Sequence, residues 1–152
     1  GGKIIFDGRD QVPKGEGYFL GPVVMENIQP GSLMATKEIF GPVIALMKVD
    51  TLDEAINLLN SSEYANTCSI FSNDGLEVQS FIDSVHPSMV GVNLGVPAPM
   101  AFFSFGGSKE SFFGDIKVHG QSSIEFFTEE HTIMQRWFGQ ESSEDINPHW
   151  KK

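Results

Sequence analysis

The stretch GPVIALMKVDTLDEAINLLN, residues 41–60, carries the clearest signal for the fold. Its apolar run at residues 43–49 has the length of a buried β-strand. Thr51 follows at the position of a helix N-cap, and Glu54 stands three residues later, which is the spacing of a capping box. Apolar residues then recur at helical spacing, namely Leu52, Ala55, Ile56 and Leu59. The segment therefore predicts a strand followed by an amphipathic helix, ending near Asn60, that packs against a sheet.

The same pattern continues downstream. Residues 67–71 fit a second strand, and Asn73 or Asp74 can cap a following helix that ends before Pro87. The apolar positions of that helix are Val78, Phe81, Ile82 and Val85. A third apolar run at residues 89–93 completes a strand-helix-strand-helix-strand order. This order predicts an α/β fold with a parallel β-α-β-α-β core and right-handed crossovers.

The segments before and after this core are less regular. Residues 1–32 are rich in Gly and Pro, and we expect brief strands at residues 3–6 and 22–25. Residues 94–105 contain two Pro and three Phe, which predicts a loop with bulky apolar contacts.

The C-terminal part gives mixed signals. Residues 124–127 are strand-like, whereas residues 132–138 fit either a helix or a strand. From residue 139 the chain is polar and acidic. We therefore expect one folded unit over residues 1–138 and an acidic flexible tail over residues 139–152.

The composition narrows the range of functions. Twenty Asp and Glu against 10 Lys and Arg give a net charge of −10, so neither nucleic acid nor an anionic membrane is an expected partner. The single cysteine, Cys68, leaves no internal disulfide or multi-cysteine zinc site and fits a reducing compartment. Thirteen Phe predict apolar surface that this chain or a neighbour must cover. Without a signal segment or an initiator Met, we expect a chain cut from a longer one.

Several short motifs, in order and at natural spacing, resemble the last part of the aldehyde dehydrogenase superfamily. They are GPVV at 21–24, EIFGPV at 38–43, TLDEAI at 51–56, Asn60, YAN at 64–66 and IF at 70–71. Three further motifs look most like the CoA-acylating methylmalonate-semialdehyde dehydrogenases: GVN at 91–93, FSFGGSKESFFGD at 103–115 and FFT at 126–128. The Ser-Phe-x-Gly-Asp ending of the second motif favours that subfamily. The resemblance covers nearly the whole chain.

The resemblance implies a partial subunit. The family has a Rossmann-like NAD domain, a catalytic α/β domain and an oligomerisation ribbon of strands. This chain would supply a catalytic-domain core at about residues 33–120 and oligomerisation-type strands at about residues 121–138. In the family a Cys thiolate attacks the aldehyde, hydride passes to NAD, and CoA resolves the thioester in this subfamily. The catalytic Cys and the NAD domain lie upstream of every matching motif. The resemblance thus implies no catalytic residue here and an inactive chain.

The resemblance also implies three contact residues. Glu38 matches the carboxylate that accepts hydrogen bonds from the two hydroxyls of the nicotinamide ribose. Phe40 would pack near the nicotinamide ring. Phe105 is a candidate wall residue of the aldehyde tunnel, although residues 94–105 fit a loop packed for stability equally well. The sequence differs from the family's pattern at Lys37, which stands where relatives usually carry a second acidic residue.

Other chemistry-bearing residues favour structural roles. Cys68 lies inside the second predicted strand, with no adjacent base, so we expect a buried apolar residue and no nucleophile. Lys109 is expected to make a structural contact between segments. The four histidines, His86, His119, His131 and His149, are far apart in sequence and lack metal-ligand spacing, so no metal site is expected.

Two hypotheses about function remain open. One is a piece of an NAD-dependent, CoA-acylating enzyme whose other part carries the Cys and the NAD domain. The other is a non-catalytic oligomerisation or interaction module of that family, and the two can coexist. The expected partners are the remaining part of the subunit or further copies of the chain, and a homo-oligomer is expected in both cases. The expected location is the cytoplasm or the mitochondrial matrix.

Overall fold

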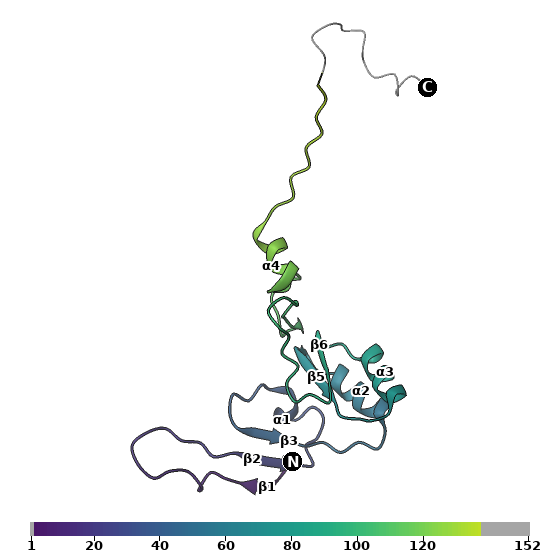
Figure 1. Ribbon diagram of the computed structural model, residues 1–152. Coiled ribbons are helices and arrows are strands. Elements are labelled where there is room, and N and C mark those ends of the chain that lie inside the picture. Colours follow the sequence, from purple (N-terminus) through teal and green to yellow (C-terminus); the bar gives the residue numbers. More distant parts are fainter. Residues whose placement is uncertain (1, 138–152) are drawn as a thin grey trace.

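The computed structural model describes residues 2–137. Their strands form three small sheets, and two helices lie beside one of these sheets. A last helix lies apart from the sheets, and an extended segment continues beyond it (Figure 1).

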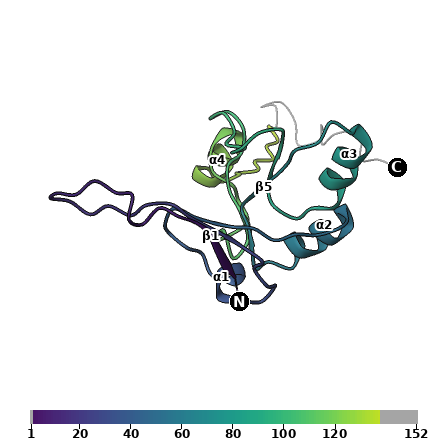
Figure 2. The same cartoon turned by 90° about the horizontal axis from the view of Figure 1, so that it is seen from below.

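The N-terminal sheet has the order β1-β2-β3. Strand β1 (Lys3–Asp7) is antiparallel to β2 (Val23–Glu26), and β2 is parallel to β3 (Val43–Ala45). Between β1 and β2 the chain makes a long loop that projects away from the body (Figure 2). The loop is closed where the amide of Gly8 donates to the carbonyl oxygen of Pro22 at 2.8 Å.

The first predicted helix forms as expected. A short helix α1 (Leu33–Thr36) precedes β3, and α2 (Leu52–Asn60) follows it. The Thr51 hydroxyl accepts the amide of Glu54 at 3.2 Å, and the Glu54 carboxylate accepts the amide of Asp50 at 2.9 Å. The capping box is therefore confirmed, with its Glu bonded one residue before the N-cap.

The second half of the predicted core also forms. Strands β5 (Thr67–Ile70) and β6 (Met89–Val92) are parallel and are joined by α3 (Gly75–Ser84). Asp74 is the N-cap of α3, because its carboxylate accepts the amides of Leu76 and Glu77. Helices α2 and α3 pack against each other, and Phe81 of α3 is buried.

The prediction of one continuous parallel sheet is wrong for this chain. Strand β3 pairs only with β2, and β5 and β6 form a separate two-stranded sheet. The sequence pattern indicates which segments become strands and which become helices, but it does not indicate which strands are neighbours. A crossover helix such as α2 can connect two strands that are not adjacent.

The strand prediction at residues 124–127 is also wrong. These residues belong to α4 (Gly120–Phe127), which begins at a turn where His119 and Gly120 have φ of 68° and 54°. A strand needs a hydrogen-bonded neighbour, and no described segment pairs with these residues.

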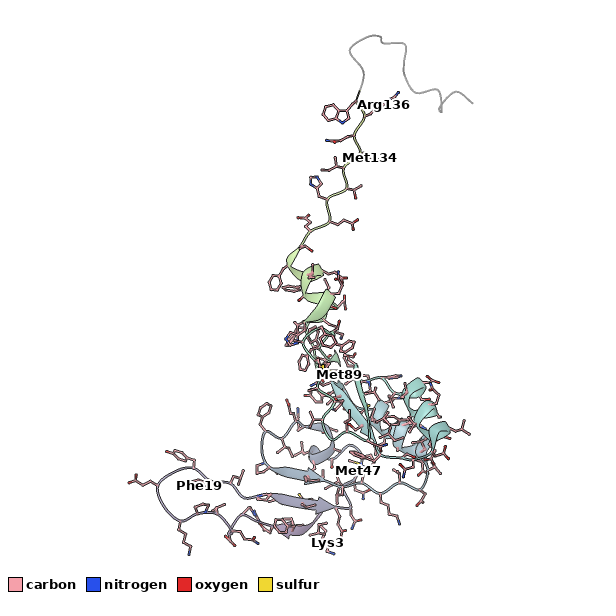
Figure 3. All side chains as sticks on the ribbon, in the orientation of Figure 1. Lys3, Phe19, Met47, Met89, Met134 and Arg136 are labelled. Atoms are coloured by element: carbon pink, nitrogen blue, oxygen red, sulfur yellow. The ribbon has the colours of Figure 1, made fainter. Side chains whose placement is uncertain are left out.

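Residues 128–137 form neither a helix nor a strand. The oligomerisation-type strands expected at about residues 121–138 are therefore not seen in the described part, and the oligomerisation role stays a prediction. Figure 3 shows Met134 and Arg136 on this segment, away from the sheets. The predicted acidic tail, residues 139–152, lies outside the described residues. A third small sheet pairs β4 (Tyr64–Ala65) with β7 (Ser108–Lys109).

The core of the described chain is small. Its buried apolar residues are Val23, Ile28, Ile56, Ala65 and Phe81. Many large apolar side chains are exposed, among them Tyr18, Phe40, Phe71, Leu76, Phe113, Phe127 and Trp137. Apolar surface on this scale normally marks a contact with other polypeptide. Among the described helices, none has the length and apolar character needed to cross a membrane.

Candidate functional site

The candidate site is built on the turn between α1 and β3. Helix α1 ends where the amide of Lys37 donates to the carbonyl oxygen of Leu33 at 2.9 Å, and Lys37 itself is extended. The amide of Gly41 then donates to the carbonyl oxygen of Ile39 at 2.9 Å. This tight turn leads into β3 and leaves the side chains of Glu38 and Phe40 exposed on its surface.

Glu38 lines an open hollow of about 430 Å³ between α1 and the start of β5. The opposite side of the hollow is formed by Asn66 and Thr67, and Glu110 contributes to its rim. Among the described residues no hydrogen bond or ion pair involves the Glu38 carboxylate. Both of its oxygens are therefore free to accept hydrogen bonds from a ligand.

Phe40 is 96% exposed, so no described residue packs over its ring. On the other side of the turn, the Cδ2 of Leu20 lies 3.7 Å from the position of a Cβ on Gly41. Glu38 therefore faces a hollow that the described chain forms in part, whereas no described residue covers the ring of Phe40.

Phe105 lies elsewhere and does not line the hollow of Glu38. It forms an antiparallel bridge with Val118, with N–O distances of 2.7 and 2.9 Å, and its ring centroid is 5.7 Å from that of His119. These contacts hold Phe105 in place, but the expected bulky apolar contacts of the loop are largely missing in the described chain, because Val96, Met100, Phe102 and Phe103 are exposed. The tunnel-wall role of Phe105 stays a prediction.

Cys68 sits in β5 opposite Val90 and is half-buried. Burial raises the pKa of the Cys68 thiol above its usual range. A raised pKa disfavours the thiolate, which is the reactive form of cysteine. The environment therefore agrees with the expectation that Cys68 is not a nucleophile.

Lys109 makes the predicted contact between segments. Its ammonium group donates to the carbonyl oxygens of Asn60 and Ser62, at 2.6 and 2.8 Å. These carbonyls lie at the C-terminal end of α2, where a cation is favourable. Lys109 therefore joins β7 to α2.

Sequence reasoning missed the role of Asn93. Its side chain accepts the amide of Ser72 and donates to the carbonyl oxygen of Ser72, both at 3.1 Å. Asn93 also has φ of 55°, a conformation that Asn tolerates better than most residues. An Asn directly after a predicted strand was the available signal. The residue fixes the point where the loop of residues 94–105 begins.

The part of the chain that the structure describes contains no cluster of side chains suited to a metal ion. No group of three or more His, Cys, Asp or Glu side chains within residues 2–137 is arranged to hold an ion. His149 lies outside these residues.

Comparisons with known proteins agree on one family. Residues 1–133 match the model of the aldehyde dehydrogenase family. Malonate-semialdehyde dehydrogenase 1 of Geobacillus thermodenitrificans is 44% identical over 138 residues, which are 90% of this chain and 28% of that protein. The chain therefore spans about 28% of the length of this curated relative.

Solved structures give the same result. The crystal structure of methylmalonate-semialdehyde dehydrogenase from Oceanimonas doudoroffii matches with a TM-score of 0.87 and 38% identity, over 91% of this chain and 29% of that chain. An aldehyde dehydrogenase of Mycobacterium tuberculosis complexed with NAD+ matches with a TM-score of 0.75 and 29% identity, over 85% of this chain and 26% of that chain.

Proposed function

Because the chain belongs to the aldehyde dehydrogenase family, we propose that it is the C-terminal part of an NAD-dependent subunit and needs the remainder of that subunit for activity. The proposed reaction is oxidation of methylmalonate semialdehyde, or a related aldehyde such as malonate semialdehyde, to an acyl-CoA. The similarity to malonate- and methylmalonate-semialdehyde dehydrogenases supports this choice of substrate.

The observation that carries the proposal is the exposure of Glu38 and Phe40. Both side chains stand on one turn; the Glu38 carboxylate has no hydrogen bond or ion pair among the described residues, and no described residue covers the Phe40 ring. A carboxylate and an aromatic ring held by a rigid turn can bind a polar ligand that also has a flat ring. The remainder of the subunit would form the opposite side of this site.

NAD fits the turn as part of a larger site. The two free oxygens of Glu38 suit the paired hydroxyls of a ribose, and Phe40 would restrict the position of the attached ring. NAD supplies the hydride acceptor when it is bound. The sequence has no Gly-x-Gly-x-x-Gly turn, so the residues that hold its phosphates would come from the remainder of the subunit.

A second candidate function is a non-catalytic interaction module. It is favoured by the apolar side chains exposed on α4 and on residues 128–137, namely Ile124, Phe126, Phe127, Ile133, Met134 and Trp137. Such a surface suits self-association or binding to intact dehydrogenase subunits. Light scattering tests self-association, because a chain that stays monomeric at all concentrations rules it out.

The proposed function is tested by reconstitution. The chain is mixed with the part of the Geobacillus relative that it does not match, and NADH formation is followed with semialdehyde and CoA. Turnover by the mixture and none by the chain alone are expected, because productive geometry requires the nucleophile and the cofactor in one site. Turnover by the chain alone that a Cys68→Ser substitution abolishes would contradict the proposal.

The role of Glu38 is tested in the same mixture. Glu38→Gln is expected to weaken NAD binding about tenfold or more, because hydrogen bonds to a charged group are lost. Glu16→Gln, on the exposed loop between β1 and β2, is the matched control and should leave binding unchanged. Equal affinities for NAD in both variants would remove Glu38 from the cofactor site.

A further inference from the structure

His119 has a backbone conformation that residues other than glycine rarely adopt. Its φ of 68° and ψ of 167° lie in a region that is strained for any residue with a Cβ. Such a conformation costs stability and persists only where the surrounding structure enforces it, most often near a functional site. The start of α4 alone does not account for it, because a helix can begin after an ordinary extended residue, as α2 does after Thr51.

Both neighbours of His119 are bonded to the apolar loop that precedes α4. Val118 and Phe105 exchange two backbone hydrogen bonds, with N–O distances of 2.7 and 2.9 Å. On the other side, the amide of Gly120 donates to the carbonyl oxygen of Ala101 at 3.1 Å. The residue between these two attachments is therefore left with the strained conformation.

Two further contacts hold this turn against the loop. A Cβ on Gly120 would stand 2.5 Å from the carbonyl oxygen of Phe102, so glycine is required there. The hydroxyls of Ser104 and Ser122 are 2.7 Å apart, which is hydrogen-bond distance. The turn and the loop thus form one unit that enforces the strain at His119.

The imidazole of His119 lies against the ring of Phe105. The two ring centroids are 5.7 Å apart and the ring planes are tilted by 39°, which is within the usual range for an aromatic pair. Within residues 2–137, no hydrogen bond or ion pair involves the imidazole. The contact between the two rings is therefore the interaction through which the side chain of His119 can act.

This contact supports the ring of Phe105 without covering it. Phe105 is 37% exposed, so part of its surface stays open. The neighbouring side chains of Phe102 and Phe103 are exposed as well. A ring that is supported on one side and open on another suits the wall of a binding site, because such a wall must be both rigid and accessible.

We propose that His119 is a positioning residue, which holds the ring of Phe105 as a wall of the aldehyde site. The strained backbone is retained because it directs the imidazole onto that ring. The inference rests on the proposed function, since Phe105 borders an aldehyde only in a complete subunit. A fixed aromatic wall restricts the site to a short aldehyde chain, such as that of a semialdehyde.

The strain is tested in the chain alone by comparing His119→Gly with His119→Ala in urea unfolding. Both lack the ring, but only Ala keeps a Cβ in the strained conformation. Gly is normally the less stable of the two, because it loses more conformational entropy on folding. At position 119 the order should be reversed, with an equilibrium constant of folding about fivefold higher for Gly than for Ala.

His86 provides the matched control for the strain. It is also exposed, and it is not among the described residues with positive φ. His86→Gly should therefore be less stable than His86→Ala, which is the normal order.

The positioning role is tested in the reconstituted mixture with malonate semialdehyde, NAD and CoA. Loss of the ring in His119→Gly and His119→Ala should raise the KM for the aldehyde about tenfold, while kcat and the KM for NAD change little. His119→Tyr keeps an aromatic ring and should restore the KM for the aldehyde. His86→Ala should leave all three constants unchanged. Stability thus follows the Cβ at position 119, whereas the KM for the aldehyde follows the ring.

The outcomes separate this inference from the proposed function. Three results overturn the inference and leave the proposed function standing. They are a His119→Gly chain that does not fold or is less stable than His119→Ala, a KM for the aldehyde that loss of the ring leaves unchanged, and a failure of His119→Tyr to restore that KM. A mixture with the unchanged chain that shows no turnover overturns the proposed function and the inference together.

Discussion

Helix α3 and the turn that carries Glu38 differ in their tertiary packing. Helix α3 has its N-cap, its buried Phe81 and its neighbours β5 and β6 within the same chain. The turn is also held by local hydrogen bonds, yet the side chains of Glu38 and Phe40 contact solvent. Local order is thus present in both regions, but tertiary burial is present in only one. The difference is what the proposed function predicts for a turn that faces another segment of the subunit.

The largest expected effect on stability comes from the buried side of α3. Phe81 is 4% exposed, and Phe81→Ala should destabilise the fold by about 3–5 kcal/mol, because it removes apolar contacts and leaves a cavity. Leu76 on the same helix is 84% exposed, so Leu76→Ala should change stability by only about 0.5 kcal/mol. Urea unfolding followed by circular dichroism measures both. Equal effects would show that the Phe81 side of α3 is no better packed than its exposed side.

A smaller effect is expected at the N-cap of α3. Asp74→Ala removes the acceptor for the amides of Leu76 and Glu77, and should cost about 1 kcal/mol. Asp74→Asn is the control, because Asn is an equally good N-cap and should retain most of the stability. If Asp74→Asn lost as much as Asp74→Ala in urea unfolding, the capping account of this helix would be wrong.

The smallest expected effect is a pH-dependent change in stability that comes from the exposed ion pair of Asp7 and Arg9, at the end of β1. Hydrogen bonds from the Arg9 guanidinium lower the pKa of Asp7 to about 2. A lowered pKa stabilises the fold above the carboxyl's unfolded pKa, near 4, and this contribution is lost as the pH falls towards 2. The carboxyl is fully exposed, so its share of the stability is small.

Arg9→Gln should return the pKa of Asp7 to the usual carboxyl range, as measured by NMR titration of the side chain. Lys14→Gln removes another cation from the same loop and should leave that pKa low. An unchanged pKa in Arg9→Gln would show that the pair does not form in solution.

The sequence was sufficient for features that depend on nearby residues. The Thr51 and Glu54 capping box, the second crossover unit and the contact made by Lys109 were all predictable, because spacing, caps and apolar periodicity act locally. The choice between Asn73 and Asp74 as N-cap required the structure.

Features that depend on distant partners were not predictable. The separation of β3 from β5 reflects which strands are neighbours, and no residue within β3 encodes that. The segment 124–127 has a strand-like composition but becomes helical, because no described strand lies beside it. For the candidate site, the sequence indicated the position of Glu38 and Phe40. It did not indicate the open hollow or the hydrogen bonds between the Asn93 side chain and the backbone of Ser72.

The incomplete cofactor site is tested most directly by calorimetric titration of the isolated chain with NAD. Glu38 and Phe40 offer contacts to one part of the cofactor only, so no binding is expected at NAD concentrations that saturate intact dehydrogenases. A micromolar dissociation constant, lost in Glu38→Gln, would show that this chain forms a whole cofactor site by itself and would contradict the account.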